Sequence, residues 1–143
     1  MNTNLEKIKN LLKKKGVKLT YQRIKILDYI KNRKKHPTVE MIYSDLIKEI
    51  PTISKTTIYN TLDVFIEKEL VVPISVPGED TRFDGNSSWH YHFICERCGR
   101  IMDLDIRCEY LEGDIVEGHR IKGFYGYFKG ICKDCLEKDR LKN

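Results

Sequence analysis

The chain has 143 residues, of which 41% are hydrophobic and 33% are charged, a balance that favours a packed globular core over disorder. No apolar run approaches the ~18 residues of a membrane span, and the segment MNTNLEKIKN lacks the apolar stretch of a secretory signal, so we expect a cytoplasmic protein. Residues 1–75 hold 15 basic and 8 acidic residues, whereas residues 76–143 hold 11 and 13, so the first half is the one expected to meet a polyanion such as DNA or a membrane surface. A solvated lysine-rich surface is the alternative.

The first half predicts helices, because apolar residues recur there at helical spacing. The residues that mark the first face are Leu5, Ile8, Leu11 and Leu12. The expected N-caps of the next three helices are Thr20, Thr38 and Ser54. The expected stops are Gly16, the basic run 31–35 and Pro51. The fourth helix is expected to reach Leu70.

A β-hairpin is predicted after these helices. Residues 70–76 are rich in β-formers, residues 77–80 form a strong turn signal, and residues 81–83 can return as the second strand. Helices followed by a hairpin describe a winged helix-turn-helix over residues 1–84, with the fourth helix as the recognition element. Its early polar positions are the candidate DNA contacts: Ser54, Lys55, Thr56, Thr57, Tyr59 and Asn60. Helix capping alone would explain the hydroxyls; their combination with a basic half and a wing favours DNA.

Residues 85–88 resemble a linker, and residues 89–143 form a second, smaller unit. Its expected strands are 91–94, 101–104 and 124–131; its expected helices are 109–119, weakened by Gly113 and Gly118, and 136–142. A unit of this size buries too little apolar surface to be stable alone, so it needs a metal, a partner subunit, or both. Helices in the first half, followed by a hairpin and a second unit of short strands and helices, make the expected fold class α+β.

Four of the five cysteines form two C-x2-C pairs: Cys95 with Cys98, and Cys132 with Cys135. Two such turns brought together make the tetrahedral S4 site that zinc prefers. The alternatives are redox dithiols or coincidence, which two copies without a thioredoxin-like context make poor. Gly99 follows the first pair, where a tight turn needs positive φ. Cys108 is left over.

A second site of different chemistry is suggested by histidines and aspartates. His90 and His92 share one face of a strand, because side chains alternate with period two. With His36, Asp84 and Asp103 they make a nitrogen and oxygen set that suits Fe2+ or Mn2+. A metal shared by the two halves could select their arrangement and act as a switch. Polar residues around a hinge are the alternative.

The motifs together resemble the ferric uptake regulator superfamily over essentially the whole chain. The residues that carry the resemblance are His90-Tyr-His92-x2-Cys95-x2-Cys98-Gly99, Cys132-x2-Cys135, Leu19-Thr-x-Gln22-Arg23, His36-Pro37-Thr38, Ser54-x-x-Thr57-Ile-Tyr59-x-x-Leu62 and Arg82-Phe83-Asp84. The resemblance implies a homodimeric, metal-dependent repressor of double-stranded operator DNA with a C-terminal dimerisation domain. It also implies that the four paired cysteines hold structural zinc, that the histidine and aspartate set holds Fe2+ or Mn2+, and that Tyr59 and Arg23 face DNA.

Within that family the resemblance is closer to the peroxide-sensing, PerR-like branch. Iron sensors usually carry glutamates where this chain has Asp84 and Asp103, whereas peroxide sensors carry aspartates. The resemblance then implies that iron and H2O2 oxidise His36 or His90 and release DNA. Iron or zinc sensing without this chemistry is the alternative. Phe124-Tyr125 stands where many members have a further histidine, so a third metal site is not expected, and His119 is expected at the surface.

Two other classes of function are disfavoured. A zinc enzyme is not expected, because an S4 zinc has no open position for substrate, and neither an H-E-x-x-H motif nor a nucleophile elbow occurs. A zinc-stabilised interaction module without DNA binding is the remaining alternative.

Overall fold

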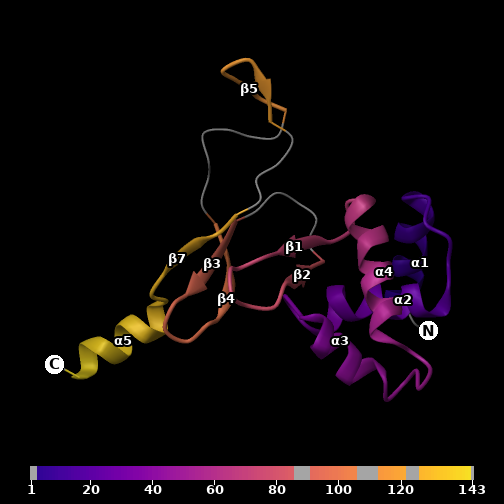
Figure 1. The fold of residues 1–143 in the computed structure, drawn as a ribbon, viewed down its shortest axis with the longest axis horizontal. Coiled ribbons are helices and arrows are strands. Elements are labelled where there is room, and N and C mark those ends of the chain that lie inside the picture. The colour runs from indigo at the N-terminus through magenta and orange to yellow at the C-terminus, as the bar shows by residue number, and fades with distance from the viewer. Residues whose placement is uncertain (1–2, 86–90, 106–112, 122–125, 143) are drawn as a thin grey trace. The chain divides into compact units, whose positions relative to one another are not determined.

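In the computed structural model, the residues described are 3–85, 91–105, 113–121 and 126–142 (Figure 1). The chain divides into two compact units, Met1–Ser87 and Ser88–Asn143. None of the helices in these ranges combines the length and the hydropathy that membrane crossing requires.

The first unit opens with four α-helices. They are α1 (Thr3–Lys14), α2 (Tyr21–Asp28), α3 (Val39–Leu46) and α4 (Lys55–Glu67). The three predicted N-caps are confirmed, because the side chains of Thr20, Thr38 and Ser54 each accept a hydrogen bond from the backbone amide three residues later.

Two helix ends differ from the prediction, and one agrees with it. The helix that begins with α2 continues as a π-helix, η1 (Tyr29–Arg33), and ends inside the basic run 31–35 as expected. The fourth helix, expected to reach Leu70, ends at Glu67. The prediction that Pro51 stops the third helix is wrong, because α3 already ends at Leu46. The chain leaves α3 through turns in which the amides of Glu49 and Ile50 both donate to the carbonyl of Leu46.

The predicted wing is present as a hairpin of β1 (Val72–Ile74) and β2 (Arg82–Asp84), which pair antiparallel. Helices followed by this hairpin make the winged helix-turn-helix expected from the sequence. The strand β2 also pairs with the segment before α3: the Phe83 amide donates to the Pro37 carbonyl at 2.9 Å, and Thr38 forms a β-bridge with Arg82.

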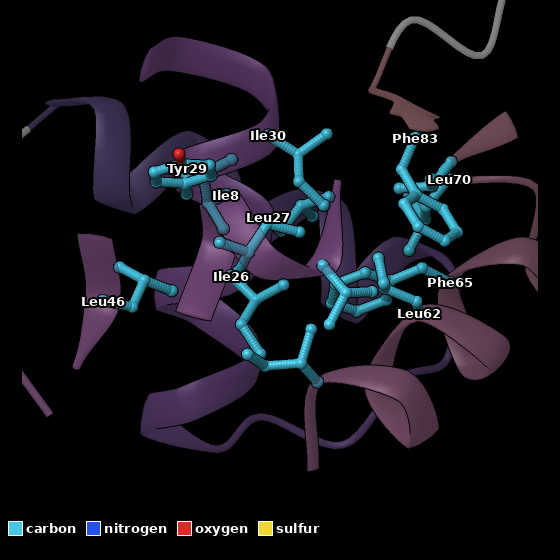
Figure 2. Packing of buried hydrophobic residues seen from close by; sticks show 14 of the residues in the cluster. Ile8, Ile26, Leu27, Tyr29, Ile30, Leu46, Leu62, Phe65, Leu70 and Phe83 are labelled. Atoms are coloured by element: carbon cyan, nitrogen blue, oxygen red, sulfur yellow. The ribbon is translucent and has the colours of Figure 1, made fainter. Parts of the chain in front are cut away.

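The core of this unit forms where the four helices and the wing meet (Figure 2). Its side chains that are almost fully buried include Leu12, Ile26, Leu27, Ile42, Leu46, Ile58, Leu62, Phe65 and Leu70. Tyr29 is also buried, and its hydroxyl donates to Asp45 Oδ2 at 2.5 Å, which lets a phenol lie in an apolar core. The buried face of α4 leaves its opposite face to solvent.

The second unit is built on a three-stranded sheet with the order β4-β3-β7. The central strand β3 (Tyr91–Cys95) pairs antiparallel with β4 (Ile101–Leu104) and parallel with β7 (Phe128–Gly130). The terminal helix α5 (Lys133–Lys142) follows.

The predicted helix over 109–119 is wrong in the part that the structure describes. A small hairpin of β5 (Ile115–Val116) and β6 (His119–Arg120) lies there instead. Its two connecting residues, Glu117 and Gly118, both have positive φ, 50° and 83°, as a two-residue type I′ turn requires. Residues 109–112, and Phe124 and Tyr125 of the predicted last strand, lie outside the described residues.

Candidate metal centres and nucleic-acid interface

The four paired cysteines meet at one point of the second unit. Their sulfur atoms all lie within 4.8 Å of one another, and both the Cys95–Cys135 and the Cys98–Cys132 sulfurs are 3.8 Å apart. A Zn–S bond of about 2.3 Å in a regular tetrahedron separates neighbouring sulfurs by about 3.8 Å, so this cluster has the dimensions of a zinc site. Four sulfur ligands would complete the tetrahedral shell of a zinc ion and leave no open position for a substrate.

Local backbone structure brings the two pairs together. Cys95 ends β3, and the turn after it closes with the Gly99 amide donating to the Cys95 carbonyl at 2.9 Å. Gly99 has φ 75°, which confirms the expected tight turn. Cys132 directly precedes α5, and Cys135 lies in its first turn. The first pair is therefore held by a tight turn after β3, and the second by the first turn of α5.

The environment of the sulfurs favours a bound cation. The amides of Cys98 and Cys132 donate to Cys95 Sγ at 3.5 and 3.3 Å, and these bonds lower the pKa of Cys95 to about 6. A hydrogen bond with the Cys132 sulfur instead raises the pKa of Cys135 to about 12. Thiolates this close repel one another, so a divalent cation is needed before all four can be deprotonated. The donor set thus fits structural zinc.

A first histidine–aspartate pair lies in the first unit. The His36 Nε2 is 3.4 Å from Asp84 Oδ2, and both residues are buried. The pairing of β2 with residues 37 and 38 brings these two side chains together, although they are far apart in the sequence.

A second pair of the same composition lies in the second unit. His92 and Asp103 are direct partners in the β3–β4 register, and His92 Nε2 is 3.6 Å from Asp103 Oδ1. His92 is buried and Asp103 is exposed. Neutral imidazole nitrogen and carboxylate oxygen are the ligands preferred by Fe2+ and Mn2+. Of the other residues singled out in the sequence, His90 and Cys108 lie outside the described residues, and His119 is exposed.

The polar residues predicted to contact DNA surround the start of α4. Lys55, Thr56, Tyr59 and Asn60 are exposed, with Tyr59 at 54%. Ser54 and Thr57 are used in the cap, since the Thr57 amide donates to Ser54 Oγ at 3.1 Å. Arg23 is half-buried, and its Nη1 donates to the Lys18 carbonyl at 2.9 Å, which ties down the loop before α2.

Comparison with known families settles which group of proteins this arrangement represents. The sequence profile described as the ferric uptake regulator family matches residues 14–123. The chain belongs to the ferric uptake regulator family.

Relatives of this family member include named peroxide regulators. The chain is 37% identical over 136 residues to the peroxide operon regulator of Bacillus subtilis, and the match covers 90% of each chain. It is 36% identical over 135 residues to the peroxide-responsive repressor PerR of Staphylococcus aureus, and that match covers 89% of this chain and 88% of that one. The solved Campylobacter jejuni peroxide stress regulator has 30% identity and a TM-score of 0.62, and the match covers 94% of this chain and 100% of that chain.

Glu40 and Tyr43, which the sequence did not single out, contact the candidate DNA-binding residue Lys55. The Lys55 ammonium forms an ion pair with Glu40 and lies 5.3 Å from the centre of the Tyr43 ring. Glu40 and Tyr43 are one helical turn apart in α3, and that spacing was the only available signal, because no sequence pattern connects them to α4. Arg82, already named in the Arg82-Phe83-Asp84 motif, donates to the backbone carbonyl of His36.

Proposed function

We propose that this protein is a homodimeric, metal-dependent repressor that binds operator DNA and releases it in response to peroxide. The observation that carries the proposal is that each unit holds a paired imidazole and aspartate, in a chain that is 36–37% identical to named peroxide regulators. Aspartate rather than glutamate in both pairs favours peroxide sensing over iron or zinc sensing.

The proposed regulatory site takes ligands from both units and from the segment that connects them. They are His36, Asp84, His90, His92 and Asp103. Fe2+ held there would supply the electron that splits the O–O bond of H2O2, with the net change that one imidazole gains an oxygen atom and one water is released. His36 and His90 are the proposed targets. Mn2+ would fill the same ligands without this chemistry.

Loss of a ligand to oxidation would loosen the metal and with it the arrangement of the two units. The protein can then act as a switch, because the metal binds one arrangement better than the others. In the metal-bound arrangement, α4 of each subunit would enter the major groove. Its exposed Thr56, Tyr59 and Asn60 would approach base edges, with Lys55 and Arg23 directed to phosphates.

Anaerobic loading with Fe2+ or Mn2+, followed by H2O2, tests the proposal. Peptide mass spectrometry should find one added oxygen atom on a peptide that contains His36 or His90, in the iron form alone, and gel-shift assays should show the iron form leaving its operator. Release of DNA by the iron form without any histidine adduct would refute peroxide sensing by this route.

A conservative variant separates sensing from metal binding. Asp103→Glu keeps a carboxylate ligand but changes its reach. We expect it to reduce peroxide sensitivity while leaving metal-dependent DNA binding largely intact. A complete loss of DNA binding in this variant would count against the assignment of Asp103. A salt titration of duplex affinity tests DNA binding itself, since phosphate contacts make affinity fall steeply as salt rises.

A further inference from the structure

The backbone of His36 adopts an unusual conformation. Its φ is 55°, in the left-handed region that side chains with a Cβ adopt rarely, and the residue is 5% exposed. A buried residue stays in such a conformation only when its surroundings hold it there. The imidazole could not keep its place 3.4 Å from Asp84 if this backbone relaxed to a common conformation.

Contacts from β2 surround this strained position. Arg82 Nη1 donates to the His36 carbonyl at 3.0 Å, and the backbone of Phe83 donates to the carbonyl of the next residue, Pro37, at 2.9 Å. The second bond belongs to the backbone and would survive any side-chain change. The bond from Arg82 is made by a side chain, and its acceptor is the backbone carbonyl of His36 itself.

The geometry of the strand explains why the same element reaches both groups. Side chains alternate along a strand, so Arg82 and Asp84 lie on one face of β2 and Phe83 on the other. Phe83 is buried in the hydrophobic core, which fixes the depth and rotation of the strand. The opposite face therefore presents a carboxylate to the His36 imidazole and a guanidinium to the His36 carbonyl.

We propose that Arg82 is a positioning residue for the metal site: by holding the His36 carbonyl, it keeps the imidazole aimed at the metal that Asp84 shares. This inference rests on the proposed regulatory site. Arg82 donates to the backbone and is not a ligand, since a guanidinium carries no free lone pair. Its contribution resembles that of the outer-shell partners that orient metal-bound histidines, whose loss typically weakens metal affinity about tenfold to a hundredfold.

The sign of the effect separates positioning from simple electrostatics. A cation beside a divalent metal repels it, so removing the charge of Arg82 without further consequence would tighten metal binding. Removing a group that positions His36 would weaken it. The exposed Lys35 precedes His36 and provides a matched control that removes a neighbouring charge but not the bond to the His36 carbonyl.

The test compares Mn2+ affinity, measured by the EPR signal of free Mn2+, in the zinc-loaded full-length protein and in the variants Arg82→Met and Lys35→Met. We expect Arg82→Met to raise the Kd for Mn2+ about tenfold and Lys35→Met to leave it unchanged or to lower it slightly. Zinc content and thermal unfolding should stay close to the unsubstituted protein, which a merely structural role of Arg82 would not allow.

Arg82→Lys gives an independent answer if the methionine variant does not fold. It keeps the charge, so electrostatics predicts no change, whereas the shorter and unbranched donor should hold the carbonyl less well and raise the Kd about threefold. If Arg82→Met binds Mn2+ as tightly as the unsubstituted protein or more tightly, Arg82 is not a positioning residue. If Arg82→Met does not fold, an unchanged Mn2+ affinity in Arg82→Lys leads to the same conclusion. Either result would leave the proposed regulatory site itself standing. If the unsubstituted protein binds no Mn2+ beyond its zinc, the regulatory site and this inference both fall.

Discussion

The guanidinium of Arg33 binds both carboxylate oxygens of Glu49, with Nη1 2.7 Å from Oε2 and Nη2 2.9 Å from Oε1. Lys25 adds a third donor, 3.0 Å from Oε1. Arg33 ends η1, Lys25 lies in α2 and Glu49 lies in the turn after α3, so one carboxylate connects three consecutive parts of the DNA-binding fold. The hydrogen bond from Arg33, helped by Lys25, lowers the pKa of Glu49 to about 2.

Acid should remove the stabilisation that Glu49 supplies. Its pKa is lower in the folded state than the ordinary value of 4.5, so the stabilisation is complete above that pH and disappears as the pH falls toward 2. Because the Glu49 side chain is 37% exposed and solvent screens the network, we expect Glu49→Gln to cost about 1 kcal/mol at pH 7. Urea unfolding of the first unit, followed by amide NMR signals between pH 7 and 3, measures the difference.

Arg33→Met provides the matching experiment from the other side of the pair. It removes the main cause of the depressed pKa, so it should lose most of the same pH-dependent stabilisation. A stability difference between Glu49→Gln and the unsubstituted protein that stays constant as the pH falls would contradict the assigned role of this carboxylate.

Close packing at Gly85 leads to a second prediction. A Cβ at this position would lie 3.0 Å from both Ile30 Cγ2 and Lys31 Cγ, and the Lys31 ammonium donates to the Gly85 carbonyl at 2.6 Å. Gly85→Ala should therefore force η1 away from the end of the wing and destabilise the first unit by about 1–3 kcal/mol. Thermal unfolding measures the loss.

The wing turn offers a contrast to Gly85. Gly78 has φ 82°, and a Cβ added there would meet no atom within 4 Å, so Gly78→Ala introduces backbone strain but no clash. We expect it to cost about 1 kcal/mol, and to leave the Mn2+ affinity of the proposed regulatory site, which includes Asp84, unchanged. If Gly85→Ala were the milder of the two substitutions, the close approach of Gly85 to η1 would not be a constraint.

The sequence predicted those features that depend on local chemistry. Capping residues located the starts of α2, α3 and α4, because a hydroxyl side chain just before an apolar run of helical period can accept a hydrogen bond from a backbone amide of the first turn. The cysteine spacing predicted the zinc cluster for a similar reason. The helix predicted over 109–119 is wrong in its described part, where the chain turns at Glu117 with a positive φ that glutamate rarely adopts.

Contacts between distant segments were not predictable in the same way. Arg82 was noted within a motif, but its bond to the His36 carbonyl depends on β2 pairing with a loop that lies 46 residues earlier in the chain. The alternation of side chains along a strand is enough to predict that Arg82 and Asp84 lie on one face of β2. No local pattern reveals which carbonyl that face meets.

Loss of zinc should unfold the second unit. Its described core around the metal consists of Cys95, Cys132 and Cys135 with a few partly buried apolar neighbours, so the metal replaces a larger hydrophobic core. Zinc binding of this kind contributes on the order of 10 kcal/mol. Cys98→Ser should abolish stoichiometric zinc, measured after denaturation with a colorimetric chelator, and remove the cooperative unfolding of this unit in circular dichroism.

Cys108→Ser is the control for that experiment, because Cys108 is outside the two C-x2-C pairs. It should retain one zinc per chain and unfold as the unsubstituted protein does. Full zinc content and unchanged unfolding in Cys98→Ser would show that the four sulfurs do not form the site.

The contact between Glu40 and Lys55 predicts a variant that binds DNA more tightly. Lys55 is the first residue of α4, and in the free protein its ammonium is held by Glu40 beside the Tyr43 ring. A phosphate that approaches this lysine has to compete with a carboxylate already bound to it. Glu40→Gln removes the competitor, so duplex affinity should rise several-fold and the slope of log affinity against log salt should steepen by up to about 0.9 per subunit.

A charge change alone would also strengthen binding, so the control must remove the same charge elsewhere on the DNA-binding unit. Glu67→Gln does this at the last residue of α4, far from Lys55 along the helix axis. Because screening limits charge effects to about 10 Å at moderate salt, Glu67→Gln should raise affinity less than Glu40→Gln does. Fluorescence anisotropy across a salt series compares them. Equal gains from both variants would mean that net charge, and not release of Lys55, governs affinity.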